Sequence, residues 1–531
     1  MKSVKNFIFN NYRGIVLFFI SIVFCYFTGN RGIFPIDSFS HYDSGYRILN
    51  GEHPFRDYWV VSGPFIDYIQ SIIFFIFGTS WQSYILNSAI LNGIISVSTY
   101  YLFINLGLKK NYSFFYSVCF AILAYPSSGT VFVDHHSVFL SMLAVYSLIL
   151  AIKNNKNIYW VLIPIFLIFA FLSKQVPATY ILFSILIILL IHLAHQSKKN
   201  FIKIIISLFL SSTSIMLFIF LFLQINHIPL ENFTKQYLYY PSTIGKERYG
   251  LINYDFKNTI LNFKFIHISI LILFLSIFKN TKLNKFFFKS FDFKLILICA
   301  FLFISLAQHL IVTKNQIFIF FLIPLYLGFA HNYLKIFKFN KKKYILIFLI
   351  LFCAGTTIKY HQRFNLERKF HELNKVNFSN SISAEKISKK FKGLNWITPR
   401  IYRNYNMNYE IKLLNVFNKI LIEEKTNKIV ITNYSFFSTI TDQNVSGFSR
   451  WYPGDNSAFP IYGNEFYDDY KEFIIKLLLK KKINTIYILP DVSEKNLTNY
   501  ISQKCFYKSE LRMGILKYDI KNECLEFSIK S

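Results

Sequence analysis

Long apolar runs alternate with short polar segments along the first 360 residues of the chain. A helix needs about 20 residues to cross the hydrocarbon core of a bilayer. Eleven segments approach this length, so the pattern predicts an α-helical polytopic membrane protein with about 11 transmembrane helices. The predicted spans are Tyr12–Gly29, Tyr84–Leu106, Tyr112–Ala124, Ser137–Ile152, Ile158–Leu172, Ala178–Ala194, Phe201–Gln224, Ile260–Phe278, Leu295–Val312, Gln316–Tyr333 and Tyr344–Ile358.

Basic residues between these spans predict how the chain crosses the membrane. Lysine clusters follow every second span, at Lys109–Lys110, Lys153 with Lys156, Lys198–Lys199, Lys279 to Lys294 and Lys335 to Lys343. Loops that stay in the cytoplasm are enriched in Lys and Arg. The N-terminus and these loops are therefore expected in the cytoplasm, and the chain after the last span in the periplasm, as in a multi-pass protein of the bacterial inner membrane.

The amino-acid composition is that of a membrane protein, and it affects how the high positive net charge is interpreted. The chain has 531 residues, of which 53% are hydrophobic and 62 are Phe, more apolar surface than a soluble fold of this length needs. Lys and Arg number 58 against 28 Asp and Glu, a formal charge of +30. Because most of these cations lie in the loops between spans, they indicate topology, and no nucleic-acid partner is expected.

The chain after residue 360 is polar and has a different periodicity. Strand-like runs occur at Lys428–Asn433, Asn484–Pro490 and Gly514–Asp519, and Asp468–Lys482 has the pattern of an amphipathic helix. We therefore expect a transmembrane domain over residues 1–360 and a C-terminal periplasmic α/β domain over 361–531. Cys505 and Cys524 both fall in this oxidising compartment, where they either form a disulfide or remain free.

The first outer loop, residues 30–83, is too long and too patterned to be a simple connector. It contains three aspartates in the stretch IDSFSHYDSGYRILNGEHPFRDYWVVSGP. Ser44–Gly51 predicts one short helix, and the apolar run Pro64–Gly78 predicts a second. Both are expected to lie in the membrane interface and to hold the acidic stretch against the membrane surface.

This loop resembles that of a known family. Its order is Asp37, Gly45-Tyr46, then Leu49-x-Gly51-x-x-Pro54-Phe55-Arg56-Asp57, Gly63-Pro64 and a hydrophobic run closing at Phe77-Gly78. It is similar to the first outer loop of GT-C glycosyltransferases of the protein-mannosyltransferase and aminoarabinose-transferase type, which use polyprenyl-phosphate-linked sugars. Many relatives have Asp-Glu where this chain has Asp37-Ser38, and a Lys before the proline where it has Ser62-Gly63.

The resemblance implies an inverting transfer from a polyprenyl-phosphate sugar to an acceptor glycan, lipid or protein outside the cytoplasm. Phosphate is already a good leaving group, so one base is enough to take the proton of the acceptor hydroxyl. Asp37 fills the position that the family uses for this base, and Asp43 is the second candidate. The alternative for Asp37 is a structural one, in which it caps the helix that follows.

Cations for the departing phosphate and aromatic rings for the sugar are expected on the outer rim. The candidates are Arg56, Asp57, Lys174, Lys246, Arg248, Tyr239 and Tyr240. Each has a structural alternative. Asp57 is expected to pair with Arg56 or to cap a turn, Lys174 can be a snorkelling lysine, and the segment around Tyr239 and Arg248 can be an interfacial belt.

Asp134, His135 and His136 are the residues that suggest a metal. Adjacent residues seldom hold one ion together, so hydrogen bonding is the favoured role, and the need for a divalent metal is left open. No Gly-rich phosphate loop or nucleotide fingerprint is present, so no nucleotide cofactor is expected. The alternatives to a glycosyltransferase are a lipid-linked polysaccharide polymerase or ligase and, with less support, a transporter, for which repeated halves and broken helices are expected.

Overall fold

A computed structural model describes residues 2–126, 129–280, 287–314, 318–336, 339–369, 373, 376–399, 406–521 and 524. The chain folds into two compact units. Unit 1 comprises Met1–Thr28, Ser88–Ile219 and Arg248–Phe370, and unit 2 comprises Gly29–Asn87, Phe220–Glu247 and His371–Ser531. The domain ranges 1–360 and 361–531 expected from the sequence stay a prediction.

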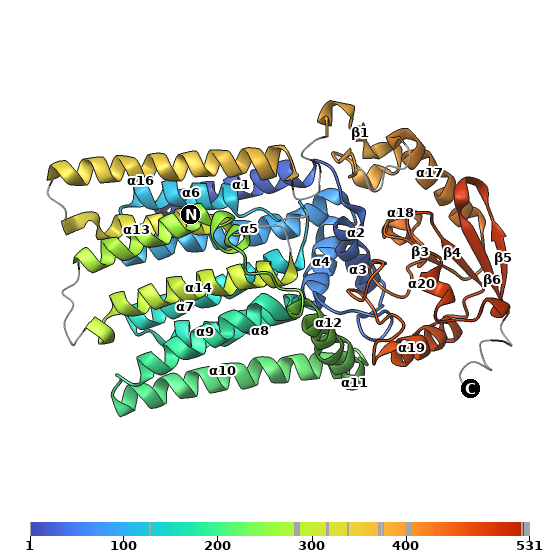
Figure 1. Ribbon diagram of the computed structural model, residues 1–531, viewed down its shortest axis with the longest axis horizontal. Coiled ribbons are helices and arrows are strands. Elements are labelled where there is room, and N and C mark those ends of the chain that lie inside the picture. The colour runs from blue at the N-terminus through green and yellow to red at the C-terminus, as the bar shows by residue number, and fades with distance from the viewer. Residues whose placement is uncertain are drawn as a thin grey trace. The chain divides into compact units, whose positions relative to one another are not determined.

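Unit 1 is helical (Figure 1). Its elements, some of which continue into unit 2, are α1 (Lys2–Gly29), α5 (Trp81–Leu106), α6 (Lys110–Leu123), α7 (Val133–Asn154), α8 (Asn157–Ser173), α9 (Gln175–Leu193), α10 (Lys198–Ile225), α13 (Lys264–Asn280), α14 (Phe291–Thr313), α15 (Leu322–Asn332) and α16 (Phe339–Tyr360). Short turns are the π-helical η2 (Lys257–Leu261) and η6 (His361–Leu366) and the 3-10 helices η3 (Phe287–Lys289), η4 (Ile319–Phe321) and η5 (Tyr333–Ile336).

Each of the eleven predicted spans coincides with a helix over most of its described length. Gln316, where one predicted span begins, lies outside the described residues. Within the described chain, seven helices are long and apolar enough to cross a membrane, and Asn157–Ser173 and Ile319–Asn332 are shorter apolar helices. The predicted fold class, a helical polytopic membrane protein with a C-terminal α/β region, is confirmed.

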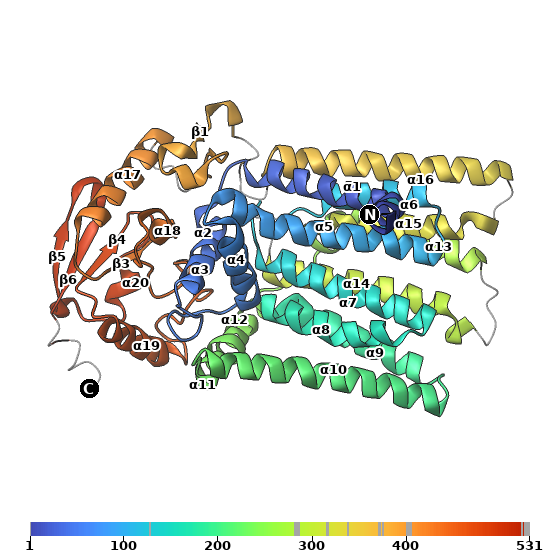
Figure 2. The ribbon, with the colours of Figure 1, turned by 180° about the vertical axis from the view of Figure 1, so that it is seen from behind.

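The helices of unit 1 differ in how far they are buried. Helix α7 packs against both α8 and α9, and most of its side chains are buried. Helix α10 has an outward apolar face, with Phe209 66% and Phe218 59% exposed. Figure 2 shows the same bundle from behind, with α7 and α8 among the other helices. An apolar face of this kind is stable in lipid and costly in water, which agrees with a membrane location.

Unit 2 contains a four-stranded sheet between helices. Its order is β3 (Lys428–Ile431), β4 (Thr485–Ile488), β6 (Leu516–Ile520) and β5 (Phe506–Glu510), with β3 and β4 parallel and the other pairs antiparallel. Helix α19 (Tyr467–Lys480) packs on one face, through the cluster that joins Ile474 to Ile486. Helix α17 (Met407–Glu423) covers the other, where the Phe417 ring lies 5.5 Å from that of Tyr487.

The strands and α19 confirm the sequence pattern, and the disulfide between Cys505 and Cys524 is present. Strand β5 and helix α17 were not among the predicted elements. The remaining elements of the C-terminal part are β1 (Ile382–Ser383), β2 (Asn395–Trp396), α18 (Phe437–Thr441), α20 (Lys495–Thr498), η8 (Phe378–Asn380), η9 (Ala384–Lys386), η10 (Lys389–Phe391), η12 (Gln503–Cys505) and η13 (Arg512–Gly514).

The first outer loop is part of unit 2. It forms α2 (Pro35–Ser38), α3 (Ser40–Leu49) and α4 (Pro64–Phe77), and the segment after α10 forms α11 (Leu230–Thr234), η1 (Lys235–Tyr239) and α12 (Tyr240–Tyr249). Helix α4 matches its prediction, because Gly63 has the left-handed φ of 75° before Pro64 at the first helical position and Gly78 ends the helix with a φ of 79°. Helix α3 begins four residues before the predicted Ser44.

The loop shares the hydrophobic core of the α/β fold. Trp59 is 2% exposed and donates its backbone N–H to the carbonyl of Phe448 at 2.8 Å. Its ring lies 5.2 Å from that of Tyr470 on α19 and 5.9 Å from that of Tyr240. Segments far apart in the sequence therefore form one core, which fixes the backbone of the acidic loop.

Candidate functional site

Arg47 is the centre of a buried charge network that fixes the first outer loop within unit 2. Its side chain is fully buried and donates from Nε to Glu52 at 2.7 Å, and from its terminal nitrogens to the carbonyls of Gly447 at 3.0 Å and Asp57 at 3.1 Å. The guanidinium also lies 3.8 Å from the centre of the Tyr58 ring. A buried guanidinium with this many acceptors orders the backbone on both sides of the contact.

Glu52 extends the network to two more residues of the C-terminal part. Asn444 donates to its carboxylate at 2.5 Å, and Lys481 forms an ion pair with it. Burial alone would raise the pKa of Glu52, but the charges of Arg47 and Lys481 hold it below its ordinary value. Glu52 is therefore ionised at neutral pH and compensates the buried cations.

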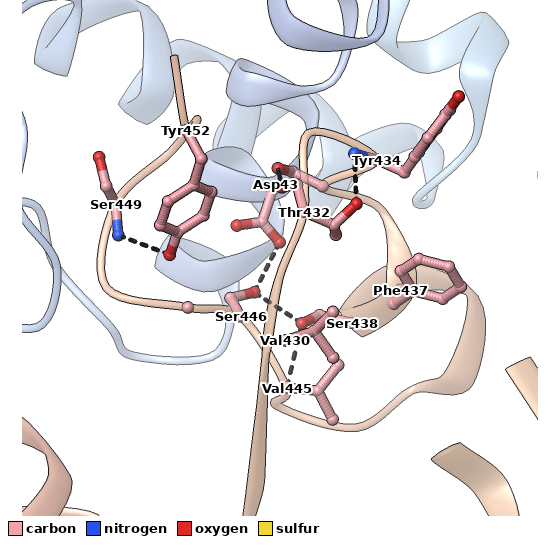
Figure 3. A pocket seen from close by; sticks show the side chains of 12 residues that line it. Asp43, Val430, Thr432, Tyr434, Phe437, Ser438, Val445, Ser446, Ser449 and Tyr452 are labelled. Atoms are coloured by element: carbon pink, nitrogen blue, oxygen red, sulfur yellow. Dashed lines mark hydrogen bonds between the residues drawn. The ribbon is translucent and has the colours of Figure 1, made fainter. Parts of the chain in front are cut away.

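Asp43 faces a small pocket at the end of β3 (Figure 3). Ser446 donates to its carboxylate at 2.6 Å, and Arg47 lies 3.8 Å away on the same helix. Burial raises the pKa of Asp43 to about 6, although Arg47 and Ser446 oppose the shift. The other polar groups of the pocket are hydroxyls, contributed by Thr432, Tyr434, Ser435, Ser438, Ser449 and Tyr452.

The size of this pocket limits what Asp43 can reach. The cavity measures about 20 Å³, which is room for a water molecule and far too little for a hexose. Ligands of α/β sheets bind beyond the carboxyl ends of the parallel strands. Here that position, after β3, holds a carboxylate of the chain's own outer loop. The geometry gives Asp43 a role in joining the loop to the α/β fold.

Arg450 forms a second buried contact between the C-terminal part and the loop. Its side chain is 0% exposed and donates to Asp67 at 2.9 Å and to the carbonyl of Ser62. His41 lies 2.6 Å from the other oxygen of Asp67. These contacts fix the turn that precedes α4. Burial lowers the pKa of His41, with a further contribution from Arg450, while Asp67 opposes it, so the ring is neutral at pH 7.

Arg56 and Asp57, two candidates for binding the donor, are engaged within unit 2. Arg56 donates to Asp57 at 2.7 Å and to the carbonyls of Asn226 and Gly51. Asp57 also accepts from the backbone N–H of His53 at 2.8 Å and from Lys480 at 2.9 Å. The alternative foreseen for Asp57, pairing with Arg56 and capping a turn, is the observed arrangement.

Asp37 lies in the first turn of α2 and is half-buried. The capping alternative predicts that it closes the N-terminus of the next helix. Among the described residues, α3 has no side-chain cap hydrogen bond at its N-cap residue, Phe39. The neighbouring Ser38 has the local structural role, because its hydroxyl accepts the backbone N–H of Phe34 at 3.0 Å. Asp37 remains the more accessible of the two candidate bases.

In unit 1 the acidic candidate Asp134 is fully buried at the start of α7. Lys174 Nζ donates to both of its carboxylate oxygens at 2.8 Å, and His309 of α14 contacts one of them. His135 and His136 instead contact the carbonyls of Ala124 and Phe132. The favoured hydrogen-bonding role is therefore observed, and among the described residues no group of three His, Cys, Asp or Glu is arranged to hold a metal ion.

The candidates on the segment after α10 are in different environments. Tyr239 is 59% exposed, whereas Tyr240 is buried and donates its hydroxyl to the carbonyl of Asn456. Tyr240 is therefore part of the hydrophobic core of unit 2. Lys246 is exposed and Arg248 half-buried, and neither side chain has a hydrogen bond or ion pair within the described chain. Both cations remain available to an anion.

Sequence reasoning missed the partners that hold the loop. Ser446, Asn444 and Arg450 lie in polar stretches with no motif, nearly 400 residues from the residues they contact. His309 is separated from Asp134 by 175 positions. The one indication in the sequence was that the acidic residues of the loop have too few cations nearby. Acidic residues that become buried then need cations or hydrogen-bond donors from elsewhere in the chain.

The chain is similar to a known protein family over part of its length. The sequence profile of the dolichyl-phosphate-mannose-protein mannosyltransferase family matches residues 53–219. The resemblance to the GT-C glycosyltransferases is thereby confirmed. The match includes Arg56, Asp57, Asp134 and Lys174 and begins after Asp37 and Asp43.

Two other comparisons complete these findings. No curated protein matches the chain. A crystal structure of ArnT from Cupriavidus metallidurans bound to undecaprenyl phosphate aligns over 95% of this chain and 97% of that chain, with 9% sequence identity and a TM-score of 0.46. At that score the likeness carries no argument about this site.

Proposed function

We propose that this protein is an integral-membrane glycosyltransferase that moves a sugar from a polyprenyl-phosphate donor to an acceptor outside the cytoplasm. The observation that carries the proposal is the match of residues 53–219 to a family named for a dolichyl-phosphate-linked sugar donor. The lipid-exposed helices of unit 1 support it, because a donor with a polyprenyl tail must be bound from the bilayer.

The proposed reaction is a single displacement at the anomeric carbon. The acceptor oxygen forms a bond to that carbon while the bond from the carbon to the phosphate oxygen breaks. The acceptor proton passes to a carboxylate, and polyprenyl phosphate leaves with the electron pair of the broken bond. One displacement inverts the configuration, and the good leaving group makes a general acid unnecessary, unlike glycoside hydrolysis.

Asp37 is the proposed base. It is half-buried, whereas Asp43 is 3% exposed. Asp43 is less suited because its carboxylate faces a cavity of about 20 Å³ and is held by Ser446 and Arg47. An acceptor hydroxyl on a sugar, lipid or protein cannot enter that space without unfolding the contact.

The cations proposed for the departing phosphate are Arg248 and Lys246, because they have no ion-pair partner in the described chain. Lys174 was also predicted to bind the departing phosphate. It is a weaker candidate in the structure, because its positive charge is already balanced by Asp134. Tyr239 is the exposed ring that can face a sugar. The proposal assigns no metal, and its acceptor is a glycan, a lipid or a protein in the periplasm.

The test is transfer of labelled sugar in membranes that carry equal amounts of wild-type protein, Asp37→Asn or Asp43→Asn. Polyprenyl-phosphate-linked mannose, glucose and pentoses serve as donors. Asn keeps the shape of the side chain but cannot take a proton, so we expect Asp37→Asn to lose about 100-fold or more in turnover, and Asp43→Asn to lose less. Near-normal transfer by Asp37→Asn would remove it as the base, and a wild type inactive with every donor would refute the reaction.

A further inference from the structure

A cluster of cations follows helix α16, at the end of the helix remote from Lys342. Four basic residues occur between positions 359 and 369, namely Lys359, Arg363, Arg368 and Lys369, with Glu367 as the single acid. In the predicted topology this end of α16 faces the periplasm. The positive-inside rule places Lys and Arg at the opposite end, so topology gives no reason for these charges.

Arg368 is built into the fold of unit 1. Its side chain is 0% exposed, and its guanidinium lies against the backbone of Gly129, in the loop between α6 and α7. A Cβ at position 129 would fall 2.2 Å from a terminal nitrogen of Arg368, and Gly129 has a φ of +77°. Only glycine permits this approach. A lysine or arginine that merely extends to the membrane interface keeps its charged head in water, unlike Arg368.

Arg363 adds a guanidinium with an unused donor. Its Nε is buried and has no hydrogen-bond partner among the described residues, and no ion pair to its side chain occurs there. The guanidinium lies 5.4 Å from the centre of the Phe364 ring, which in turn lies 5.8 Å from the ring of Tyr125. A buried donor without an acceptor costs free energy unless a ligand supplies one.

The charges of the cluster act on common neighbours. Burial raises the pKa of the Tyr125 hydroxyl, while Arg363 and Arg368 both oppose this shift. Burial lowers the pKa of Lys369, Arg363 lowers it further, and Glu367 opposes the change. Arg363 therefore repels Lys369 in a partly desolvated place, and an anion bound beside them would relieve that repulsion.

The backbone that carries the cluster is held firmly. Asn365, in the π-helical turn η6, is 0% exposed and donates to the carbonyl of Ile122 at 3.0 Å. Its other contacts are to His361 at 2.9 Å and to Thr28 of α1 at 3.4 Å. Tyr360, just before the turn, stacks on Phe320 at 3.6 Å. A fixed backbone reduces the entropy lost when a ligand binds.

We propose that Arg363, Arg368 and Lys369 form a binding site for the phosphate group of a polyprenyl-phosphate lipid. The assignment to this lipid rests on the proposed function, whereas the anion site rests on the buried Arg368 and on the unpartnered Nε of Arg363. Guanidinium groups fit phosphate because their paired donors match its oxygens. The site also supplies positive charge that Lys174 does not, since Lys174 is neutralised by Asp134.

The test measures binding of undecaprenyl phosphate to purified full-length protein in detergent by native mass spectrometry. The variants are Arg363→Gln, Lys369→Gln and, as a control for loss of one positive charge, the exposed Lys257→Gln. Losing one charge-assisted contact is expected to weaken binding 10-fold to 100-fold in Arg363→Gln. Lys257→Gln should bind within 2-fold of the wild type, and Arg363→Lys should lose less than Arg363→Gln.

Two further ligands distinguish the sources of phosphate. Phosphatidylglycerol and inorganic phosphate are titrated in the same way. Inorganic phosphate should bind more weakly but with the same dependence on Arg363, whereas phosphatidylglycerol should show no comparable dependence. Equal losses with phosphatidylglycerol would make this a site for bulk lipid and overturn the assignment to the donor. Unchanged binding of undecaprenyl phosphate in both Arg363→Gln and Lys369→Gln would overturn the site itself.

Sugar transfer, measured separately, keeps the two proposals apart. If the wild type transfers sugar while both Arg363→Gln and Lys369→Gln bind undecaprenyl phosphate normally, the reaction stands and the site is refuted. If the wild type transfers no sugar but binding still depends on Arg363, the site stands and the reaction is refuted. Arg368→Gln is not used, because a fully buried arginine can be needed for folding.

Discussion

Replacing Arg450 by methionine should destabilise unit 2 more than any surface change in the chain. Methionine has a similar length and flexibility, so the change removes the charge and its hydrogen bonds with little loss of volume. Asp67, 0% exposed, loses the bond of 2.9 Å from the guanidinium and keeps its contact with His41. The carbonyl of Ser62 also loses its donor.

The magnitude follows from the burial of both partners. Breaking a fully buried ion pair by removing one member costs about 3–5 kcal/mol, because the remaining charge stays desolvated. For a unit of a few hundred residues each kcal/mol lowers the midpoint of thermal unfolding by about 2–4 °C. Arg450→Met should therefore lower the midpoint of unit 2 by about 10 °C.

The effect should depend on pH through His41. In the wild type, burial and Arg450 keep the pKa of His41 low. Removing Arg450 takes away one of the two influences that lower this pKa, so the pKa of His41 in the folded variant is higher than in the wild type. Protonation of His41 then opposes folding less in the variant as pH falls below the unfolded pKa of about 6.5. The loss caused by Arg450→Met should be smaller at pH 5.5 than at pH 7.5.

The assay is thermal unfolding of purified protein in detergent, followed by tryptophan fluorescence at both pH values. Arg512→Met serves as the control because Arg512 is exposed, and it should shift the midpoint by no more than 2 °C. The double variant Arg450→Met with Asp67→Asn removes both charges and should recover part of the loss. A single variant as stable as Arg512→Met, or a double variant whose losses simply add, would refute the argument that a buried pair fixes the turn before α4.

Two further predictions test charge and topology. Burial would raise the pKa of Asp57, but Arg56, the N–H of His53 and Lys480 lower it to about 2. The ionised carboxylate therefore contributes about 2 kcal/mol of stability above pH 4, and this stability is lost as pH falls towards 2. Asp57→Asn should remove this pH dependence from acid unfolding curves, and an unchanged curve would contradict the prediction. A thiol probe that cannot cross membranes should label Lys342→Cys only from the cytoplasmic side, and the reverse sidedness would overturn the predicted topology.

Local sequence signals predicted the elements well, and contacts between distant segments could not be predicted. The boundaries of α4 follow from Gly63, Pro64 and Gly78, whose backbone preferences act within a few residues. The strands β3 and β4 follow from short apolar runs. The start of α3 was placed too late because Ser40 and His41 are polar in sequence but buried in the fold. Tertiary burial overrides local pattern at such positions.

The roles of the candidate site residues were even harder to predict from the sequence than the boundaries of the helices and strands. Asp37, Asp43 and Asp57 of the first outer loop were identified from the sequence, but Glu52 and Asp67, which hold its buried contacts, were not. The role of each acid depends on which of them the C-terminal part of the chain neutralises. That information lies in Ser446 and Arg450, which no spacing or motif connects to the loop. Arg363 and Arg368 were likewise passed over, since a basic stretch after an apolar span has the pattern of an ordinary membrane flank.

The different roles proposed for Asp37 and Asp43 account for a loop that is both rigid and reactive. A general base must keep a carboxylate that an acceptor can approach, whereas a loop held against the membrane must be fixed by buried contacts. One carboxylate cannot do both, because the contact with Ser446 and Arg47 that holds Asp43 also encloses it. The proposed mechanism separates the two roles by six positions: Asp43 fixes α3, and Asp37, on the preceding turn, is the proposed base. It follows that Ser446→Ala should impair transfer through the position of the loop, raising KM and lowering kcat together, while Asp37→Asn should lower kcat and leave the binding of donor unchanged.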